Sequence, residues 1–156
     1  MGLQVAGAGE VRAEDSFDVG KVAEWLREHA QDTTGLDAEP QVRQFSGGAS
    51  NLTYLLSYPG RDLILRRAPS GTKAKGAHDM GREYRIQSRL APVLPYIAPM
   101  VAHCDDPDLI GAEFYVMQRV KGIILRSDMP AELNFSAEQT KALCKSFIDK
   151  LVDLHN

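Results

Sequence analysis

The segment from Phe45 to Gly122 contains three features whose order restricts the fold: a loop of small residues, a strand ending in basic residues, and a charged helix. The loop is FSGGASNLTY, the strand is LILRR and the helix is GREYRIQSRL. Residues 46–50 lack bulk, so their backbone N–H groups can approach an anion closely, and Gly47 and Gly48 can adopt a positive φ. The loop is therefore a candidate phosphate cradle.

The loop leads directly into an apolar strand. Pro59 and Gly60 then predict a hairpin that returns the chain along Arg61–Arg67. This return places Arg66 and Arg67 beside the loop, where their charge would favour an anion. A Gly-Gly pair followed by Ser and Asn is also an ordinary hairpin connection, and the residues alone leave this alternative open.

Two later segments continue the pattern. Glu83 lies in a segment where Tyr84 and Ile86 are among apolar residues with the spacing of a helix packed on one side. Residues 112–119 (AEFYVMQR) are apolar enough to predict a buried strand. The Val-Lys-Gly that follows, residues 120–122, predicts a hinge before a new segment.

The pattern as a whole predicts an antiparallel α+β lobe of five strands with one inserted helix. Residues 1–15 are rich in Gly and Ala without periodicity, and they predict a flexible tail. The expected strands are 41–46, 51–58, 61–67, 100–104 and 112–119, and the expected helices are 17–30, 79–91 and 136–156.

Composition argues against several classes of protein. The 156 residues are 44% hydrophobic, which is enough for a core. The 18 basic and 21 acidic residues give a net charge of -3, so we expect no nucleic-acid partner. No apolar run approaches the roughly 20 residues of a membrane helix, and no signal peptide is evident, so we expect a cytoplasmic protein without a membrane partner. Cys104 and Cys144 are far apart and no histidines cluster, so we expect no metal site in this chain.

The order of loop, basic strand, helix Glu and strand with hinge resembles the small lobe of the protein-kinase-like phosphotransferases. In detail it is similar to the aminoglycoside phosphotransferase and choline kinase branch. The strings FSGGASNLTY, LILRRAPSG, AHDMGREYRI and IGAEFYVMQRVKG resemble the phosphotransferase-like domains fused to some acyl-CoA dehydrogenases. The resemblance covers roughly Phe17 to Asn156.

The resemblance implies roles for the loop, strand and helix. Arg66 would contact the α and β phosphates of a nucleotide, and Glu83 would pair with Arg66 and hold it in place. Many kinases have Lys at this position, and the planar fork of Arg gives a different contact geometry. Arg67 competes for this role, but strand alternation lets only one of the two arginines face the site. The loop residues that would fold over the phosphates are Ser46, Gly47, Gly48, Ser50 and Asn51.

The resemblance also implies a purine site at the hinge. Met117 aligns with the back of the adenine pocket, and the backbone of Gln118 and Val120 aligns with the carbonyl and amide that pair with the purine edge. A backbone contact has no side-chain signature, and a plain core strand would have the same sequence. This assignment therefore depends on the resemblance.

In the family, a large lobe handles the transferred phosphoryl group through a His-Gly-Asp segment, a later Asn and an Asp that holds Mg²⁺. The 156 residues contain no such segment, so we expect this chain alone to be inactive, with the Mg²⁺ ligands in the missing lobe. The last helix resembles the first helix of that lobe, and Ser136 and Gln139 predict a capping box at its start. We expect residues 16–122 to form the nucleotide-binding small lobe and residues 123–156 to begin a truncated large lobe.

The implied function is that of a small-molecule kinase, which uses ATP or GTP with Mg²⁺ to phosphorylate a hydroxyl-bearing small molecule. The alternative is a non-catalytic nucleotide-binding or scaffold domain. The last helix carries an apolar stripe whose partners the chain does not encode, so a homo-oligomer through this helix is also expected. The stripe consists of Leu143, Phe147, Leu151 and Leu154.

Overall fold

The computed structural model of the chain describes residues 7–46, 51–69, 79–125 and 128–155. The chain divides into two units, Met1–Val120 and Lys121–Asn156. The first unit contains the sheet and two of the helices, and the second contains the last helix. This division lies close to the predicted end of the small lobe at Gly122.

The first unit is built on a six-stranded sheet in the order β1-β2-β3-β4-β6-β5. Every pairing is antiparallel, which confirms the predicted α+β class. Five of the strands were predicted, and β1 is an addition at the edge. Strand β6 lies between β4 and β5, although it follows β5 in the sequence. The strands are β1 (Ala8–Gly9), β2 (Gln41–Phe45), β3 (Leu52–Tyr58), β4 (Arg61–Arg67), β5 (Met100–Cys104) and β6 (Phe114–Gln118).

The hairpin between β3 and β4 fixes the register at the centre of the sheet. Gly60 has a φ of +86°, which residues with a side chain rarely adopt, and Tyr58 pairs with Arg61 on either side of the turn. The turn predicted at Pro59-Gly60 is therefore confirmed. Because side chains alternate along a strand, this register decides which face of the sheet each residue of β3 and β4 occupies.

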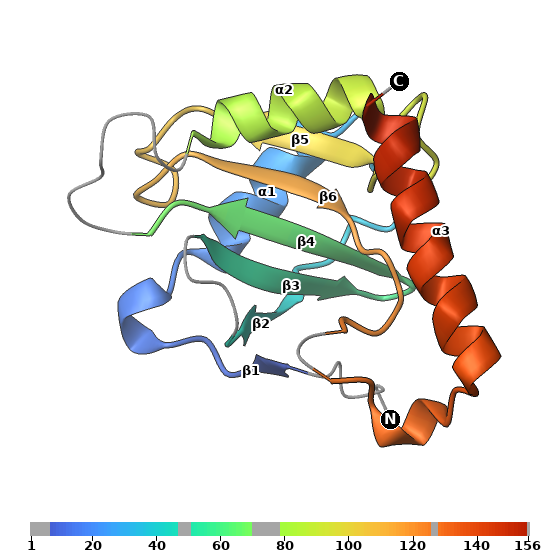
Figure 1. Cartoon of the computed structure of the whole chain (residues 1–156). Coiled ribbons are helices and arrows are strands. Elements are labelled where there is room, and N and C mark those ends of the chain that lie inside the picture. The colour runs from blue at the N-terminus through green and yellow to red at the C-terminus, as the bar shows by residue number, and fades with distance from the viewer. Residues whose placement is uncertain (1–6, 47–50, 70–78, 126–127, 156) are drawn as a thin grey trace. The chain divides into compact units, whose positions relative to one another are not determined.

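Helix α1 (Val19–His29) covers one face of the sheet and lies behind it in Figure 1. It begins after Asp18, whose side chain accepts a hydrogen bond from the Lys21 N–H at 3.0 Å. Trp25 packs edge-on against Phe114, with 5.2 Å between the ring centroids. The core on this face includes Val22, Leu26, Leu36, Tyr54, Leu56, Leu63, Leu65, Phe114 and Val116.

Helix α2 (Met80–Leu90) lies on the opposite face of the sheet, over β5 and β6. The Tyr84 ring stacks on His103 at 5.1 Å, and His103 pairs with Tyr115 in the sheet register. Tyr115 follows Phe114, which faces α1, so alternation directs Tyr115 and its neighbours toward α2. The two helices therefore cover opposite faces of one sheet.

The start of α2 follows the sequence expectation, and one of its apolar residues does not. Asp79 caps the helix by accepting a hydrogen bond from the Arg82 N–H at 2.7 Å. Met80 is fully buried, but Ile86 is 52% exposed, although we expected it on the packed side. Ile86 follows Tyr84 by two positions, which is a rotation of about 200° around a helix, so the two side chains point in nearly opposite directions.

Residues 7–15, which we expected in a flexible tail, contain a short strand of the sheet, β1, and a buried aspartate. Ala8 pairs with Phe45 and Gly9 pairs with Gln44, so this segment extends the sheet beyond β2. A short 3-10 helix, η1 (Ala13–Asp15), follows, and Asp15 is buried. The tail expectation is therefore wrong for residues 7–15, and residues 1–6 lie outside the described residues.

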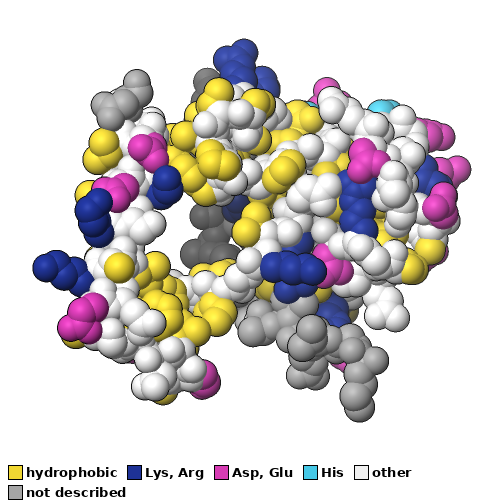
Figure 2. Space-filling model, turned by 90° about the vertical axis from the view of Figure 1, so that its right-hand side faces the viewer, with side chains coloured by type: hydrophobic (Ala, Val, Ile, Leu, Met, Phe, Trp, Pro, Cys, Tyr) yellow, Lys and Arg dark blue, Asp and Glu magenta, His cyan; other side chains and the backbone are white. Residues whose placement is uncertain are grey.

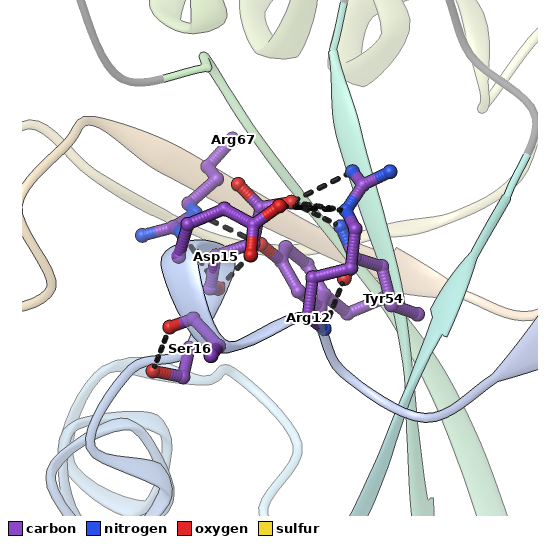
Figure 3. A network of polar contacts seen from close by, with 8 residues as sticks. Arg12, Asp15, Ser16, Tyr54 and Arg67 are labelled. Atoms are coloured by element: carbon purple, nitrogen blue, oxygen red, sulfur yellow. Dashed lines mark hydrogen bonds and ion pairs between the residues drawn. The ribbon is translucent and has the colours of Figure 1, made fainter.

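A polar network holds Asp15 against the sheet (Figure 3). Its Oδ2 accepts a hydrogen bond from Gln44 Nε2 at 2.8 Å and pairs with Arg12 Nη2 at 2.6 Å. The bond from Gln44, helped by Arg12, lowers the pKa of the Asp15 carboxyl although burial opposes the shift. Asp15 and Gln44 are 29 positions apart, so no local pattern in the sequence indicates this contact.

The second unit contains a short 3-10 helix, η2 (Ala131–Leu133), and helix α3 (Ala137–His155). The predicted capping box is confirmed: the Ser136 N–H donates to Gln139 Oε1 at 2.8 Å, and Ser136 Oγ accepts from the Gln139 N–H at 3.2 Å. Three residues of the predicted apolar stripe are exposed, namely Phe147 at 64%, Leu151 at 39% and Leu154 at 44%.

Figure 2 shows Lys, Arg, Asp and Glu side chains interspersed, with hydrophobic side chains between them. Within the described ranges, no helix is both long enough and apolar enough to cross a membrane.

Candidate functional site

Arg66 and Glu83 meet on the face of the sheet that α2 covers. Arg66 is the next-to-last residue of β4, and Glu83 lies in the first turn of α2. Arg66 Nη1 lies 3.4 Å from Glu83 Oε2, and both side chains are about one-third exposed, at 30% and 31%. The structure thus brings together the cation and the carboxylate that the sequence proposed as partners. Contact with a nucleotide stays a prediction.

Tyr115 is a third member of this group, and the sequence analysis missed it. It lies directly opposite Arg66 in the register of β4 and β6. Its hydroxyl accepts from Arg66 Nη1 at 3.0 Å and from Gln87 Nε2 at 3.1 Å, and it donates to Glu83 Oε2 at 3.0 Å. Only the pairing of β4 with β6, two strands that are distant in the sequence, could have indicated this residue.

The hydroxyl of Tyr115 remains protonated at ordinary pH. Burial raises its pKa, which the nearby Arg66 only partly opposes. A protonated hydroxyl can donate to the Glu83 carboxylate while it accepts from Arg66 and Gln87. The tyrosine therefore joins the cation and the carboxylate through one oxygen.

Asn51 connects the proposed phosphate loop to the same carboxylate. It is buried, and its Nδ2 donates to Glu83 Oε1 at 3.0 Å. Glu83 therefore uses one oxygen for Asn51 and the other for Tyr115 and Arg66. This contact fixes the chain at the point where the loop ends and β3 begins.

Of the proposed phosphate loop, the structure describes Ser46 and Asn51. Ser46 directs its backbone N–H to the Gly7 carbonyl at 3.2 Å, so this donor is not free for an anion, contrary to our expectation for Ser46. The N-terminal segment, which we had placed in a tail, supplies this acceptor. The proposed contacts of Gly47, Gly48 and Ser50 lie outside the described residues.

The proposed hinge residues lie at the end of β6. Met117 is half-buried and pairs with Ile64 of β4. The Gln118 N–H donates to the Pro99 carbonyl at 2.9 Å, on the side away from β4. Because the N–H and C=O of a strand residue share a side, the Gln118 carbonyl also points away from β4. Val120 follows the strand and is 67% exposed.

Arg67 is excluded from the site because it is buried on the other face. Its guanidinium donates to the Asp15 carbonyl at 2.7 Å and the Tyr54 hydroxyl at 3.1 Å (Figure 3). It also donates to the Ile110 carbonyl at 2.9 Å. Its side chain therefore ties the N-terminal segment to the core of the sheet. Of the two adjacent arginines, Arg66 alone lies beside Glu83.

A second set of contacts positions α2 on the sheet. His103 Nε2 forms a hydrogen bond of 2.8 Å with Glu113 Oε1, and the His103 ring stacks on Tyr84. Gly81 allows this close packing, because a Cβ at this position would lie 2.8 Å from Glu113 Oε1. These contacts hold the first turns of α2, which include Glu83.

The arrangement presents a fixed guanidinium to an anion. Within the described ranges, Arg66 Nη1 is engaged by Tyr115 and Glu83, whereas Nε and Nη2 have no partner. A planar guanidinium with free N–H groups binds phosphate oxygens with strong, directional hydrogen bonds. The group can therefore bind a phosphate while its anchor stays in place.

A family model described as the phosphotransferase enzyme family (APH) matches residues 41–156 of the chain. The matched span begins at β2 and continues through α3, so it includes every residue of the site described above except the Gly7 carbonyl. It covers more than half of the chain.

Two curated relatives extend this finding. The chain is 34% identical over 155 residues to acyl-CoA dehydrogenase family member 11 of Gallus gallus, and the match covers 96% of this chain and 19% of that protein. It is 38% identical over 86 residues to acyl-CoA dehydrogenase family member 10 of Mus musculus, which covers 55% of this chain and 8% of that protein. The chain therefore spans at most about a fifth of the length of either relative.

A solved structure has the same fold. It is the crystal structure of a protein from Ralstonia eutropha JMP134 that is assigned as an aminoglycoside phosphotransferase. The TM-score is 0.59 at 33% identity, and the match covers 71% of this chain and 30% of that chain. The antiparallel sheet with its helices is therefore similar to an aminoglycoside phosphotransferase fold of the protein-kinase-like kind.

Proposed function

The chain belongs to the phosphotransferase enzyme family, and from this premise we propose that it binds the phosphates of ATP or GTP. In the whole protein, the phosphoryl group would pass from this nucleotide to a hydroxyl of a small molecule. The observation that carries the proposal is the Arg66 guanidinium, which Tyr115 and Glu83 hold at Nη1 while Nε and Nη2 have no partner within the described residues.

Electrostatics favours an anionic ligand such as a phosphate at this position. A polyphosphate requires a fixed positive charge, and a guanidinium offers paired N–H donors that match phosphate oxygens. Asn51 places the end of the small-residue loop beside the same carboxylate that anchors Arg66. Asn51 at the end of the loop and the Arg66 cation thus both contact Glu83, so the loop and the cation lie close enough to share a phosphate.

The purine contact belongs to the same proposal. The Gln118 carbonyl points away from β4 at the end of β6, and the exposed Val120 follows it. We assign these two backbone positions, with Met117 behind them, to the purine edge. Which of the two bases, adenine or guanine, binds to this backbone would depend on how the donors and acceptors of the base match the backbone carbonyl and N–H groups.

Mg²⁺ is implied by the family, but no ligands for it are assigned here. The described part of the chain contains no group of three or more His, Cys, Asp or Glu side chains that could hold a metal ion. We therefore name no metal ligand and no catalytic residue among these residues. The hydroxyl acceptor is likewise proposed for the whole protein, and the chain spans 19% of the length of the relative from Gallus gallus.

Calorimetric titration of the chain with ATP and with GTP, each with Mg²⁺, tests the proposal. We expect one of them to bind, and Arg66→Ala to weaken the binding by about 1.5–3 kcal/mol, or roughly tenfold to 150-fold, because charge-assisted hydrogen bonds are lost. Arg89→Ala is the matched control, since it removes the same charge from an exposed position of α2.

The outcomes separate clearly. Equal affinities for the wild type and Arg66→Ala would remove Arg66 from the proposed role. An equal loss of affinity in Arg89→Ala would show that the effect comes from the net charge and does not depend on the position of the arginine. Binding in the whole protein without transfer to any hydroxyl compound would instead indicate a non-catalytic nucleotide-binding domain.

A further inference from the structure

The proposed function gives Arg66 the contact with phosphate and treats the Tyr115 hydroxyl only as one of its two anchors. We propose that Tyr115 is a positioning residue, which aims Arg66 at the phosphates and thereby sets the affinity for the phosphate part of the nucleotide. This inference rests on the proposed function. It concerns the residue that orients the cation, whereas the proposed function concerns the cation itself.

Distances indicate that the tyrosine, more than the carboxylate, fixes Arg66. Arg66 Nη1 lies 3.0 Å from the Tyr115 hydroxyl and 3.4 Å from Glu83 Oε2, so the hydroxyl is the closer partner. A separation of 3.4 Å gives a weak, poorly directional bond, whereas 3.0 Å is typical of a good hydrogen bond. Without the hydroxyl, Arg66 would keep the longer contact with Glu83 and its place over the aromatic ring, 5.9 Å from the centroid, but would lose its shortest hydrogen bond.

The position of the hydroxyl is itself fixed. The Tyr115 ring is fully buried, and it pairs across the sheet with Arg66 and His103. Gln87 donates to the hydroxyl from the next turn of α2 after Glu83, so both partners on the helix hold the same oxygen. A rigid ring bonded at its tip cannot follow Arg66 if the arginine moves, and it therefore restrains the arginine.

The restraint should be specific for the phosphate part. Arg66 and Tyr115 lie on β4 and β6 beside α2, whereas the proposed purine contact is made by the backbone after Met117. Removing one hydroxyl leaves the backbone of β6 unchanged. Loss of the hydroxyl should therefore weaken the binding of ATP and ADP, and leave the binding of the nucleoside almost unchanged.

The chain offers a matched control. Tyr58 is also buried, but in the described part of the chain its hydroxyl has no hydrogen-bond partner. Tyr58→Phe removes the same atom from the same kind of residue without disturbing a bonded group. Any effect that arises from the loss of a buried hydroxyl as such will appear in both variants.

The experiment measures dissociation constants for the triphosphate that the wild type binds and for its nucleoside. The proteins are the wild type, Tyr115→Phe, Arg66→Ala, the Tyr115→Phe/Arg66→Ala double variant and Tyr58→Phe. We expect Tyr115→Phe to weaken the binding of the triphosphate about fivefold to twentyfold, on the scale of a single hydrogen bond, and the binding of the nucleoside less than about twofold. Tyr58→Phe should change neither.

The double variant decides between positioning and general support. If Tyr115 acts through Arg66, adding Tyr115→Phe to Arg66→Ala will not weaken the binding of the triphosphate further, because the guanidinium that Tyr115 orients is absent. This comparison remains decisive even where nucleoside binding is too weak to measure. Independent effects that multiply in the double variant would overturn the positioning role.

Two other results would also overturn it. Unchanged triphosphate affinity in Tyr115→Phe, or equal losses for triphosphate and nucleoside, would show that the hydroxyl does not act on the phosphate part. Failure of the wild type to bind any nucleoside triphosphate would refute the proposed function first, and this role with it. The wild-type titration thus distinguishes the two failures.

Discussion

At the scale of single residues, Arg66 and Arg67 show how strand alternation separates two identical side chains. Arg66 is 30% exposed and has two donor nitrogens without a partner within the described ranges. Arg67 is 3% exposed, and each of its nitrogens donates to an oxygen of the core. One arginine is available to a ligand, and the other stabilises the fold.

Replacement of these arginines should therefore have opposite consequences. We expect Arg67→Ala to lower the free energy of unfolding by about 2–4 kcal/mol, because the Asp15 and Ile110 carbonyls and the Tyr54 hydroxyl lose a buried donor. Arg66→Ala should lower it by less than about 1 kcal/mol, as for a partly exposed ion pair. Urea denaturation of both variants checks this, and similar losses in the two would contradict the assignment.

At the scale of elements, α2 is the part of the fold that assembles the site. It carries Glu83 and Gln87, and Asp79 caps its first turn. It approaches the sheet closely at Gly81, beside the pair of His103 and Glu113. The placement of this one helix therefore controls whether Glu83 reaches the strand residues.

Gly81→Ala tests this close approach. In a helix, Ala is more stable than Gly by about 0.5–1 kcal/mol, but a Cβ here would lie 2.8 Å from Glu113 Oε1 and displace it from His103. We expect no net gain of stability in the wild-type background. In a Glu113→Ala background, the same substitution should raise the free energy of unfolding by about 0.5–1 kcal/mol.

Denaturant unfolding of the four proteins in this cycle measures the coupling between the two positions. The prediction requires the two backgrounds to differ. If Gly81→Ala has the same effect with and without the Glu113 side chain, the helix does not approach the sheet as closely as the structure shows.

At the scale of the whole molecule, buried tyrosines make the first unit sensitive to alkaline pH. Burial raises the pKa of the Tyr54, Tyr58 and Tyr115 hydroxyls, which lie on β3 and β6. An unfolded tyrosine ionises near pH 10. Above about pH 10 the unfolded chain therefore loses protons that the folded chain keeps, and the free energy of unfolding falls as the pH rises.

Urea denaturation at about pH 8 and at about pH 11 measures this decrease. Tyr58→Phe should make the decrease smaller, since one of the three buried hydroxyls no longer titrates. A free energy of unfolding that stays constant across this range, or a decrease that Tyr58→Phe leaves unchanged, would contradict the assignment of these groups.

Much of the fold was predictable because it depends on local properties of the chain. A positive φ at Gly60 produces the central turn. Because successive strand residues point to opposite faces, Arg66 and Arg67 lie on opposite sides of the sheet. The Ser136 and Gln139 side chains cap the last helix. Each of these features needs only neighbours within a few positions. The five predicted strands and the opposite faces of the two arginines followed from them.

The tertiary structure decided what depends on pairing between distant segments. The two residues of β1 have no alternation to reveal them, and they gain their place by bonding to β2. In the sequence, Tyr115 is indistinguishable from an ordinary core residue. Only the pairing of β6 with β4 brings its hydroxyl to Arg66, which is 49 positions away. The sequence by itself determined which residues carry the charge of the site. Only the packing of α2 and β6 determined what holds that charge in place, because contacts between distant segments leave no local pattern.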